Sequence, residues 1–161
     1  INTDPSAIEL AEIAIQSAKF AASYTKEKIR VAFLSFASFG GNPHKETKKI
    51  AQSVEIVKSR KPNFEVDGEM GADVALDAGV RNHAFPFCSL TGNANVLIFP
   101  SLAAANIAYK LLTHLGGAIP MGPVIMGLNQ SAHAVRMEAS VKELVSMIYL
   151  TAHESLYRKK V

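Results

Sequence analysis

The sequence predicts an α/β fold in which a largely parallel sheet lies between two layers of helices. Short runs of β-branched and aromatic residues alternate with longer segments of helical periodicity, as is typical of strand–helix–strand units. The clearest of these runs, residues 29–36 (IRVAFLSF), is apolar almost throughout. Such a run indicates a strand that is covered on both faces.

The first half of the chain begins with a predicted helix over residues 5–24. Thr3 and Asp4 are expected to cap it, with Pro5 in its first turn. Its apolar stripe is expected to contain Ile8, Ala11, Ile15, Ala18 and Ala22. The strand over residues 29–36 then leads through a turn-rich loop, residues 37–43, into a helix over residues 44–60 that Pro62 ends.

The second half continues with a short strand over residues 64–66, a turn at Asp67-Gly68-Glu69, a helix over residues 72–80 and a loop over residues 81–92. A buried strand over residues 95–99 precedes a helix that Ser101 caps and that ends near His114. Residues 121–126 and 132–137 are expected to be strands. Ser140 and Glu143 form a predicted capping box for a last helix, whose apolar side is expected to hold Val141, Leu144, Val145, Ile148 and Ala152.

The composition indicates one globular domain over residues 1–161, with 48% hydrophobic and 19% charged residues. No apolar run reaches the roughly 20 residues of a membrane helix. The single Cys88 favours a reducing, cytoplasmic compartment and is interpreted as a packing residue. The net charge of +3 would suit a phosphate-bearing ligand, whereas lysines without interleaved aromatics disfavour nucleic acid.

Candidate ligand-binding residues lie where predicted strands run into helices, because parallel sheets bind ligands at that edge. Ser38, Gly40, Gly41 and Asp67 occupy two such junctions. Their backbone N–H groups could hold phosphate, although plain turns explain them as well. Asn106 is expected to point inward from its helix, either to bind a ligand or to hold a neighbouring loop. The five histidines show no metal-ligand spacing, so no metal site is predicted.

Four motifs in order, VAFLSFASFGG, KSRKPNFEVDGEM, NVLIFPSLAAANIAYKLL and GPVIMGLN, resemble the phosphate acetyl/butyryltransferase family. The resemblance covers about residues 3–155. It is closest to the version fused behind bacterial NADP-dependent malic enzymes. It implies half of a phosphotransacetylase-like (isocitrate/isopropylmalate dehydrogenase-like) three-layer fold, as the C-terminal portion of a longer chain. The first residue, Ile1, agrees with a fragment.

The resemblance also implies that the chemistry of acyl transfer is lost. Active family members place a Ser-Arg pair where this chain has Arg136-Met137, an Asp at Glu143 and an Arg at His114. The thioether of Met137 cannot replace a permanently charged phosphate clamp. Arg136 and Lys110 are the remaining candidates for a phosphate or coenzyme A contact, and solvent-facing side chains are the alternative for both.

The expected function is therefore a regulatory or oligomerisation domain of an NADP-dependent malic enzyme, which decarboxylates malate oxidatively to pyruvate. The resemblance implies acetyl-CoA as an allosteric effector, with NADP and a divalent metal held only in an upstream malic enzyme domain. A homodimer or higher homo-oligomer is expected. Two alternatives stay open: an active phosphate acetyltransferase, and a purely structural dimerisation module.

Overall fold

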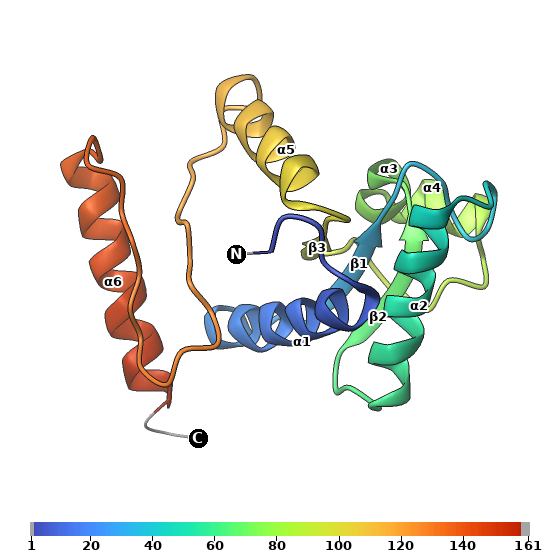
Figure 1. Ribbon diagram of the computed structural model, residues 1–161, viewed down its shortest axis with the longest axis horizontal. Coiled ribbons are helices and arrows are strands. Elements are labelled where there is room, and N and C mark those ends of the chain that lie inside the picture. The colour runs from blue at the N-terminus through green and yellow to red at the C-terminus, as the bar shows by residue number, and fades with distance from the viewer. Residues whose placement is uncertain (1, 159–161) are drawn as a thin grey trace. The chain divides into compact units, whose positions relative to one another are not determined.

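The computed structural model describes residues 2–158, and its contacts divide the chain into two compact units, Ile1–Tyr109 and Lys110–Val161. Each unit is described by itself. Unit 1 contains α1 (Ala7–Tyr24), β1 (Arg30–Leu34), α2 (Lys45–Ser59), β2 (Glu65–Met70), α3 (Ala72–Leu76), α4 (Ala78–Ala84) and β3 (Val96–Ile98). α5 (Leu102–His114) crosses the boundary, and unit 2 continues to α6 (Val141–Arg158) (Figure 1). No helix of the described residues is both long and apolar enough to span a bilayer.

The three strands of unit 1 form a parallel sheet in the order β2–β1–β3. Val31 of β1 pairs with Val66 on one side and with Val96 on the other. The prediction of an α/β fold with a parallel sheet is thus confirmed.

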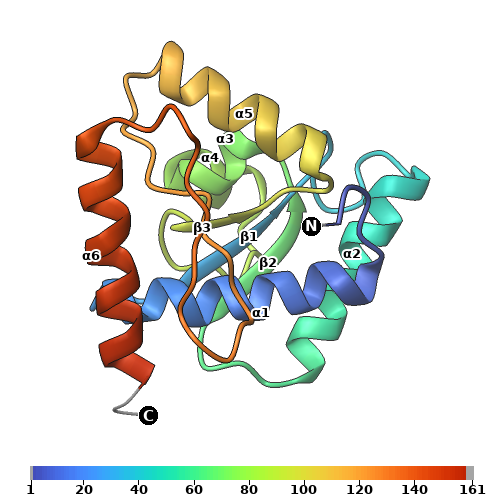
Figure 2. The ribbon, with the colours of Figure 1, turned by 60° about the vertical axis from the view of Figure 1, so that its left-hand side comes forward.

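Alternate residues of β1 enter two different hydrophobic clusters, which places helices on both faces of the sheet (Figures 1 and 2). Val31 and Phe33 pack with apolar residues of α1 and α2. Ala32 and Leu34 pack with α3 and with residues that lead into β3. The two-residue period of a strand gives each layer its own set of side chains.

The N-termini of α1 and α2 are set by side-chain caps. Ser6 and Glu9 form a capping box at α1, so the predicted start at Pro5 is wrong by two residues. The predicted stripe is only partly correct, because Ile8 is 62% exposed whereas Leu10 is buried. α2 agrees with its prediction to within one residue at each end, and the imidazole of His44 caps it.

The predicted turn at Asp67-Gly68-Glu69 is wrong, because β2 runs through it to Met70. β1 supplies the hydrogen-bonding partner for this segment and therefore decides its conformation. Gly68 has a φ of 142°, and a Cβ there would lie 2.7 Å from the carbonyl oxygen of Phe33. The close approach of the two strands, rather than a turn, requires glycine.

Two short helices replace the single helix predicted over residues 72–80. The carboxylate of Asp77 accepts hydrogen bonds from the N–H groups of Gly79 and Val80, so that it caps α4 and ends α3. α4 extends into the predicted loop and carries Arg81, whose side chain is fully buried. Its guanidinium donates to the carbonyl groups of Val74 (3.0 Å) and Gly92 (2.7 Å), among others.

Unit 2 holds the rest of α5, an irregular segment and α6. The strands predicted over residues 121–126 and 132–137 are wrong, since neither segment pairs with a strand among residues 2–158. The segment is instead held by side chains: the Ile125 N–H donates to Nδ1 of His133, and Nε2 of His133 lies 3.1 Å from the carboxylate of Glu154 on α6.

The Ser140–Glu143 capping box of α6 is confirmed by reciprocal hydrogen bonds. The predicted apolar side is wrong, because α6 buries Met147 and Leu150 whereas Val141 and Ile148 are 77% and 67% exposed.

Candidate functional site

The β1–α2 loop leaves the carboxyl edge of the sheet, where open α/β folds bind ligands. It contains three predicted site residues, Ser38, Gly40 and Gly41. The end of β2 lies beside it, since the Gly71 N–H donates to the Ser38 hydroxyl oxygen at 2.9 Å. The structure therefore brings this loop and the end of β2 together.

Three backbone N–H groups of this loop are already used within the protein. Phe39 donates to the carbonyl oxygen of Glu69 (2.8 Å), Gly40 donates to its carboxylate (2.6 Å), and Gly41 donates to the carbonyl oxygen of Ser38 (3.0 Å). In this conformation the loop is a closed turn. The N–H groups of Phe39, Gly40 and Gly41 are therefore not free to form a phosphate cradle.

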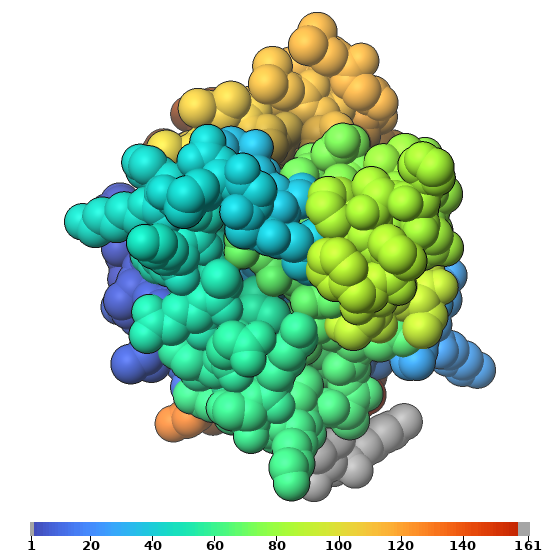
Figure 3. All heavy atoms as spheres, turned by 90° about the vertical axis from the view of Figure 1, so that its right-hand side faces the viewer, coloured from blue at the N-terminus to red at the C-terminus, as the bar shows by residue number. Residues whose placement is uncertain are grey.

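Aromatic side chains cover the outside of the loop. The ring of Phe39 lies 5.0 Å from that of Phe85 and 5.1 Å from that of Phe87. Figure 3 shows the loop (cyan) in contact with the yellow-green segment that carries these two residues. This packing explains how Phe39 is held at a φ of 48°, which is uncommon for a non-glycine residue.

Glu69 lies in a junction that the sequence suggested, but its role as the partner of the β1–α2 loop was not predicted. Its side chain belongs to the end of β2, is 3% exposed and holds Gly40. A carboxylate within a strand-forming segment is the signal that could have identified it, but the Asp-Gly step before it favours a turn. The Glu69 carboxyl group therefore gives the loop a fixed hydrogen-bonding partner within the protein.

Asp67 lies within β2 and is 5% exposed. Its carboxylate accepts from the Lys58 ammonium group (2.8 Å) and from the Ser89 N–H (2.7 Å) and hydroxyl (3.0 Å). Burial by itself raises the pKa of Asp67, but the hydrogen bonds from Lys58 and Ser89 outweigh it and lower the pKa. These partners account for a charged Asp67 without a ligand, and its predicted ligand contact stays a prediction.

α5 carries three predicted site residues, Asn106, Lys110 and His114. Their spacing of four residues places them on one face of the helix. All three are exposed, so the expectation that Asn106 points inward is wrong. α5 has no buried residue at all, and an outward Asn106 needs no loop to satisfy its amide.

Arg136 and Glu143 are brought together in unit 2. Nη2 of Arg136 lies 3.0 Å from Oε1 of Glu143, and Oε2 of Glu143 accepts from the N–H and hydroxyl of Ser140. These bonds from Ser140, followed by that from Arg136, lower the pKa of Glu143. Met137 is 99% exposed. The guanidinium is thus engaged by the helix cap, and its neighbour offers solvent only a thioether.

The described residues contain no group of three or more His, Cys, Asp or Glu side chains that could hold a metal ion. Cys88 is half-buried, and its burial raises the pKa of its thiol. A raised pKa disfavours the nucleophilic thiolate, in agreement with a packing role.

Residues 1–152 match the family described as phosphate acetyl/butaryl transferase, and the chain belongs to this family. It is 39% identical over 152 residues to an NADP-dependent malic enzyme of Haemophilus influenzae, which covers 94% of this chain and 20% of that protein. It is 38% identical over 151 residues to a phosphate acetyltransferase of Paracoccus denitrificans, covering 94% of this chain and 48% of that protein.

Solved structures agree with this assignment. EutD phosphotransacetylase from Staphylococcus aureus superimposes with a TM-score of 0.90 at 34% identity, covering 96% of this chain and 48% of that one. The chain therefore spans about half the length of the Paracoccus denitrificans phosphate acetyltransferase and about a fifth of the Haemophilus influenzae malic enzyme.

Proposed function

We propose that this chain is the phosphotransacetylase-like module of an NADP-dependent malic enzyme, and that it binds acetyl-CoA without transferring the acetyl group. In this proposal acetyl-CoA regulates malate oxidation in an upstream module, which holds NADP and a divalent metal.

The observation that carries the proposal is the environment of Arg136 and Met137. The family resemblance implies a Ser-Arg pair at these positions in active members. Here Arg136 is paired with Glu143, and Met137 is 99% exposed. Met137 offers no donor to a developing negative charge, and the guanidinium of Arg136 is paired with Glu143 at the helix cap. Loss of one such donor costs roughly 10²–10³ in rate.

Binding requires less of the site than catalysis does. Lys110 is an exposed cation that can contact a phosphate of coenzyme A, and Asn106 is an exposed amide that can bond to the amide groups of its pantetheine arm. Arg136 would have to exchange Glu143 for the ligand. The N–H groups of Gly40 and Gly41 are used within the protein and are not counted among the phosphate contacts.

Calorimetry with the intact protein tests the binding part of the proposal. Acetyl-CoA should bind, and Lys110→Ala should weaken it about tenfold by removing a charge-assisted contact. Lys19→Ala removes an equal charge from the exposed face of α1 and should have no effect. If acetyl-CoA produces no heat and no rise in Tm, the binding proposal is rejected.

Two other functions are supported by particular observations. The phosphate acetyltransferase relatives are as similar as the malic enzymes, which keeps an active acyltransferase as an alternative. The exposed apolar residues of α5 and α6 favour a structural homo-oligomer module. Sedimentation of the intact protein with and without acetyl-CoA distinguishes the structural module from the regulatory one. A purely structural module would form the same oligomer whether or not acetyl-CoA is present.

A further inference from the structure

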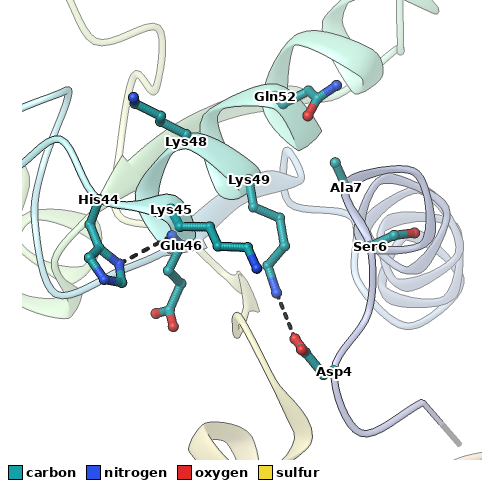
Figure 4. A pocket seen from close by; sticks show the side chains of 9 residues that line it. All are labelled: Asp4, Ser6, Ala7, His44, Lys45, Glu46, Lys48, Lys49 and Gln52. Atoms are coloured by element: carbon teal, nitrogen blue, oxygen red, sulfur yellow. Dashed lines mark hydrogen bonds and ion pairs between the residues drawn. The ribbon is translucent and has the colours of Figure 1, made fainter.

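A groove of about 770 Å³ lies in unit 1, between the segment that precedes α1 and the first turns of α2. Its charged and titratable lining consists of Asp4, His44, Lys45, Glu46, Lys48 and Lys49 (Figure 4). None of these residues was singled out for the proposed acetyl-CoA site.

Two ammonium groups in this groove act on one carboxylate. Nζ of Lys49 lies 2.8 Å from Oδ1 of Asp4 and also donates to the carbonyl oxygen of Pro100 at 3.4 Å. Figure 4 shows the side chains of Lys45 and Lys49 ending next to each other above Asp4, while Lys48 points away. Lys49 first and then Lys45 lower the pKa of Asp4, so both positive charges reach this carboxylate.

One exposed carboxylate is a weak counterion for this pair. Asp4 is 83% exposed at its side chain, and an ion pair that open to water contributes little to stability. Lys45 has no ion pair within 4 Å in the described part of the chain. The positive end of the α2 dipole adds to the same potential.

We propose that Lys45 and Lys49 form a binding site for a multivalent phosphate group. The carboxylate of Asp4 occupies the position that this phosphate takes when it binds. A phosphate carries a larger negative charge than a carboxylate and has three acceptor oxygens, so it bridges two ammonium groups better. The chemistry fits a nucleotide phosphate and free pyrophosphate equally. This site shares no residue with the proposed acetyl-CoA site, and the two proposals are independent of each other.

The test is calorimetric titration of the intact protein with inorganic pyrophosphate at low ionic strength, where surface electrostatics are least screened. Lys45→Ala and Lys49→Ala should each weaken binding about fivefold or more. Asp4→Asn should tighten it about threefold, because the variant removes the competing carboxylate. A parallel titration with adenosine 3′,5′-bisphosphate distinguishes the sources: tighter binding than pyrophosphate identifies a nucleotide ligand, and equal or weaker binding identifies free pyrophosphate.

Two control variants separate the site from net charge. Glu55→Gln changes the net charge as Asp4→Asn does, and Lys19→Ala changes it as Lys45→Ala does; both side chains are exposed on helices. Both controls should keep the wild-type affinity within twofold, and circular dichroism should show all variants folded. The proposal is overturned if the wild-type protein does not bind pyrophosphate at millimolar concentration, if Asp4→Asn fails to tighten binding, or if the controls shift as the site variants do.

Discussion

Glu65 and Asp67 illustrate how single residues of β2 hold unit 1 together. Glu65 pairs with Lys28 (2.6 Å) and accepts from the N–H and hydroxyl of Thr91. Asp67 joins Lys58 of α2 to Ser89. The two carboxylates therefore tie the segment that leads into β3 to the edge strand of the sheet.

Replacing Asp67 with Asn should lower the free energy of unfolding by about 1–3 kcal/mol, because a charged, nearly buried acceptor loses its bonds to Lys58 and Ser89. Urea denaturation measures the change. Glu55→Gln removes the other carboxylate near Lys58, at 4.0 Å and 76% exposed, and should cost less than about 0.5 kcal/mol. Equal losses in the two variants would contradict the role assigned to Asp67.

The stability of the protein should depend on Glu65 at low pH. Burial raises the pKa of this carboxyl, but hydrogen bonds from Lys28 and Thr91 outweigh it and lower the pKa to about 2 from 4.5. The stabilisation is therefore fully present above pH 4.5 and is lost as the pH falls toward 2. Urea midpoints measured across this window should fall less steeply in Glu65→Gln than in the wild-type protein. Parallel pH profiles would show that Glu65 is not the titrating group.

At the scale of elements, the sequence predicted correctly those helices and strands whose formation depends on residues close together in the sequence. α2 and the capping box of α6 follow from local chemistry, and β1 follows from its apolar run. β2 could not be predicted beyond Val66, because its ladder with β1 overrides the turn preference of Asp67-Gly68. The strands predicted in unit 2 fail for the reverse reason, since β-branched residues alone do not form a strand without a partner.

The candidate site was predictable only in part, for a related physical reason. Sequence reasoning placed Ser38 and Gly40 at the edge of the sheet, but it could not show that buried Glu69 occupies the N–H of Gly40. Arg81 was missed likewise, since a fully buried arginine is rare. Both residues act through contacts with residues that are distant in the sequence. The periodicity of hydrophobic residues carries no information about such contacts.

α4 should depend on Arg81. Replacing it with Met keeps an unbranched side chain but leaves the carbonyl groups of Val74 and Gly92 without their donor. We expect a loss of at least about 2 kcal/mol in the free energy of unfolding, measured in urea. Arg60→Met is the matched control, because Arg60 only forms an exposed pair with Glu12 and should cost less than about 1 kcal/mol. A loss in Arg81→Met as small as in the control would refute this role.

The cap of α1 gives a further prediction at this scale. Ser6→Ala removes the acceptor for the Glu9 N–H and should cost about 1 kcal/mol in urea denaturation. Ser17→Ala, in the middle of the same helix, removes a hydroxyl without a capping role and should not destabilise the protein. A loss of the same size in Ser17→Ala would contradict the capping argument.

At the scale of the whole molecule, the chain has the fold of its family and lacks the side chains that the resemblance assigns to acyl transfer. A parallel sheet with helices on both faces superimposes on a phosphotransacetylase at a TM-score of 0.90. Fold similarity alone does not carry an activity, which depends on the residues of a site. In the proposed function, Arg136 in the helix cap and Met137 in solvent are such residues.

The most direct test of this account is the formation of acetyl-CoA from acetyl phosphate and coenzyme A by the intact protein, followed by thioester absorbance. A module that binds acetyl-CoA without transferring its acetyl group should show no rate above the uncatalysed background, in the same preparation whose Tm rises with acetyl-CoA. Turnover in the ordinary enzymatic range, about 1 s⁻¹ or faster, would contradict this expectation, because the chain would then transfer acyl groups without the Ser-Arg pair that the resemblance implies for active members.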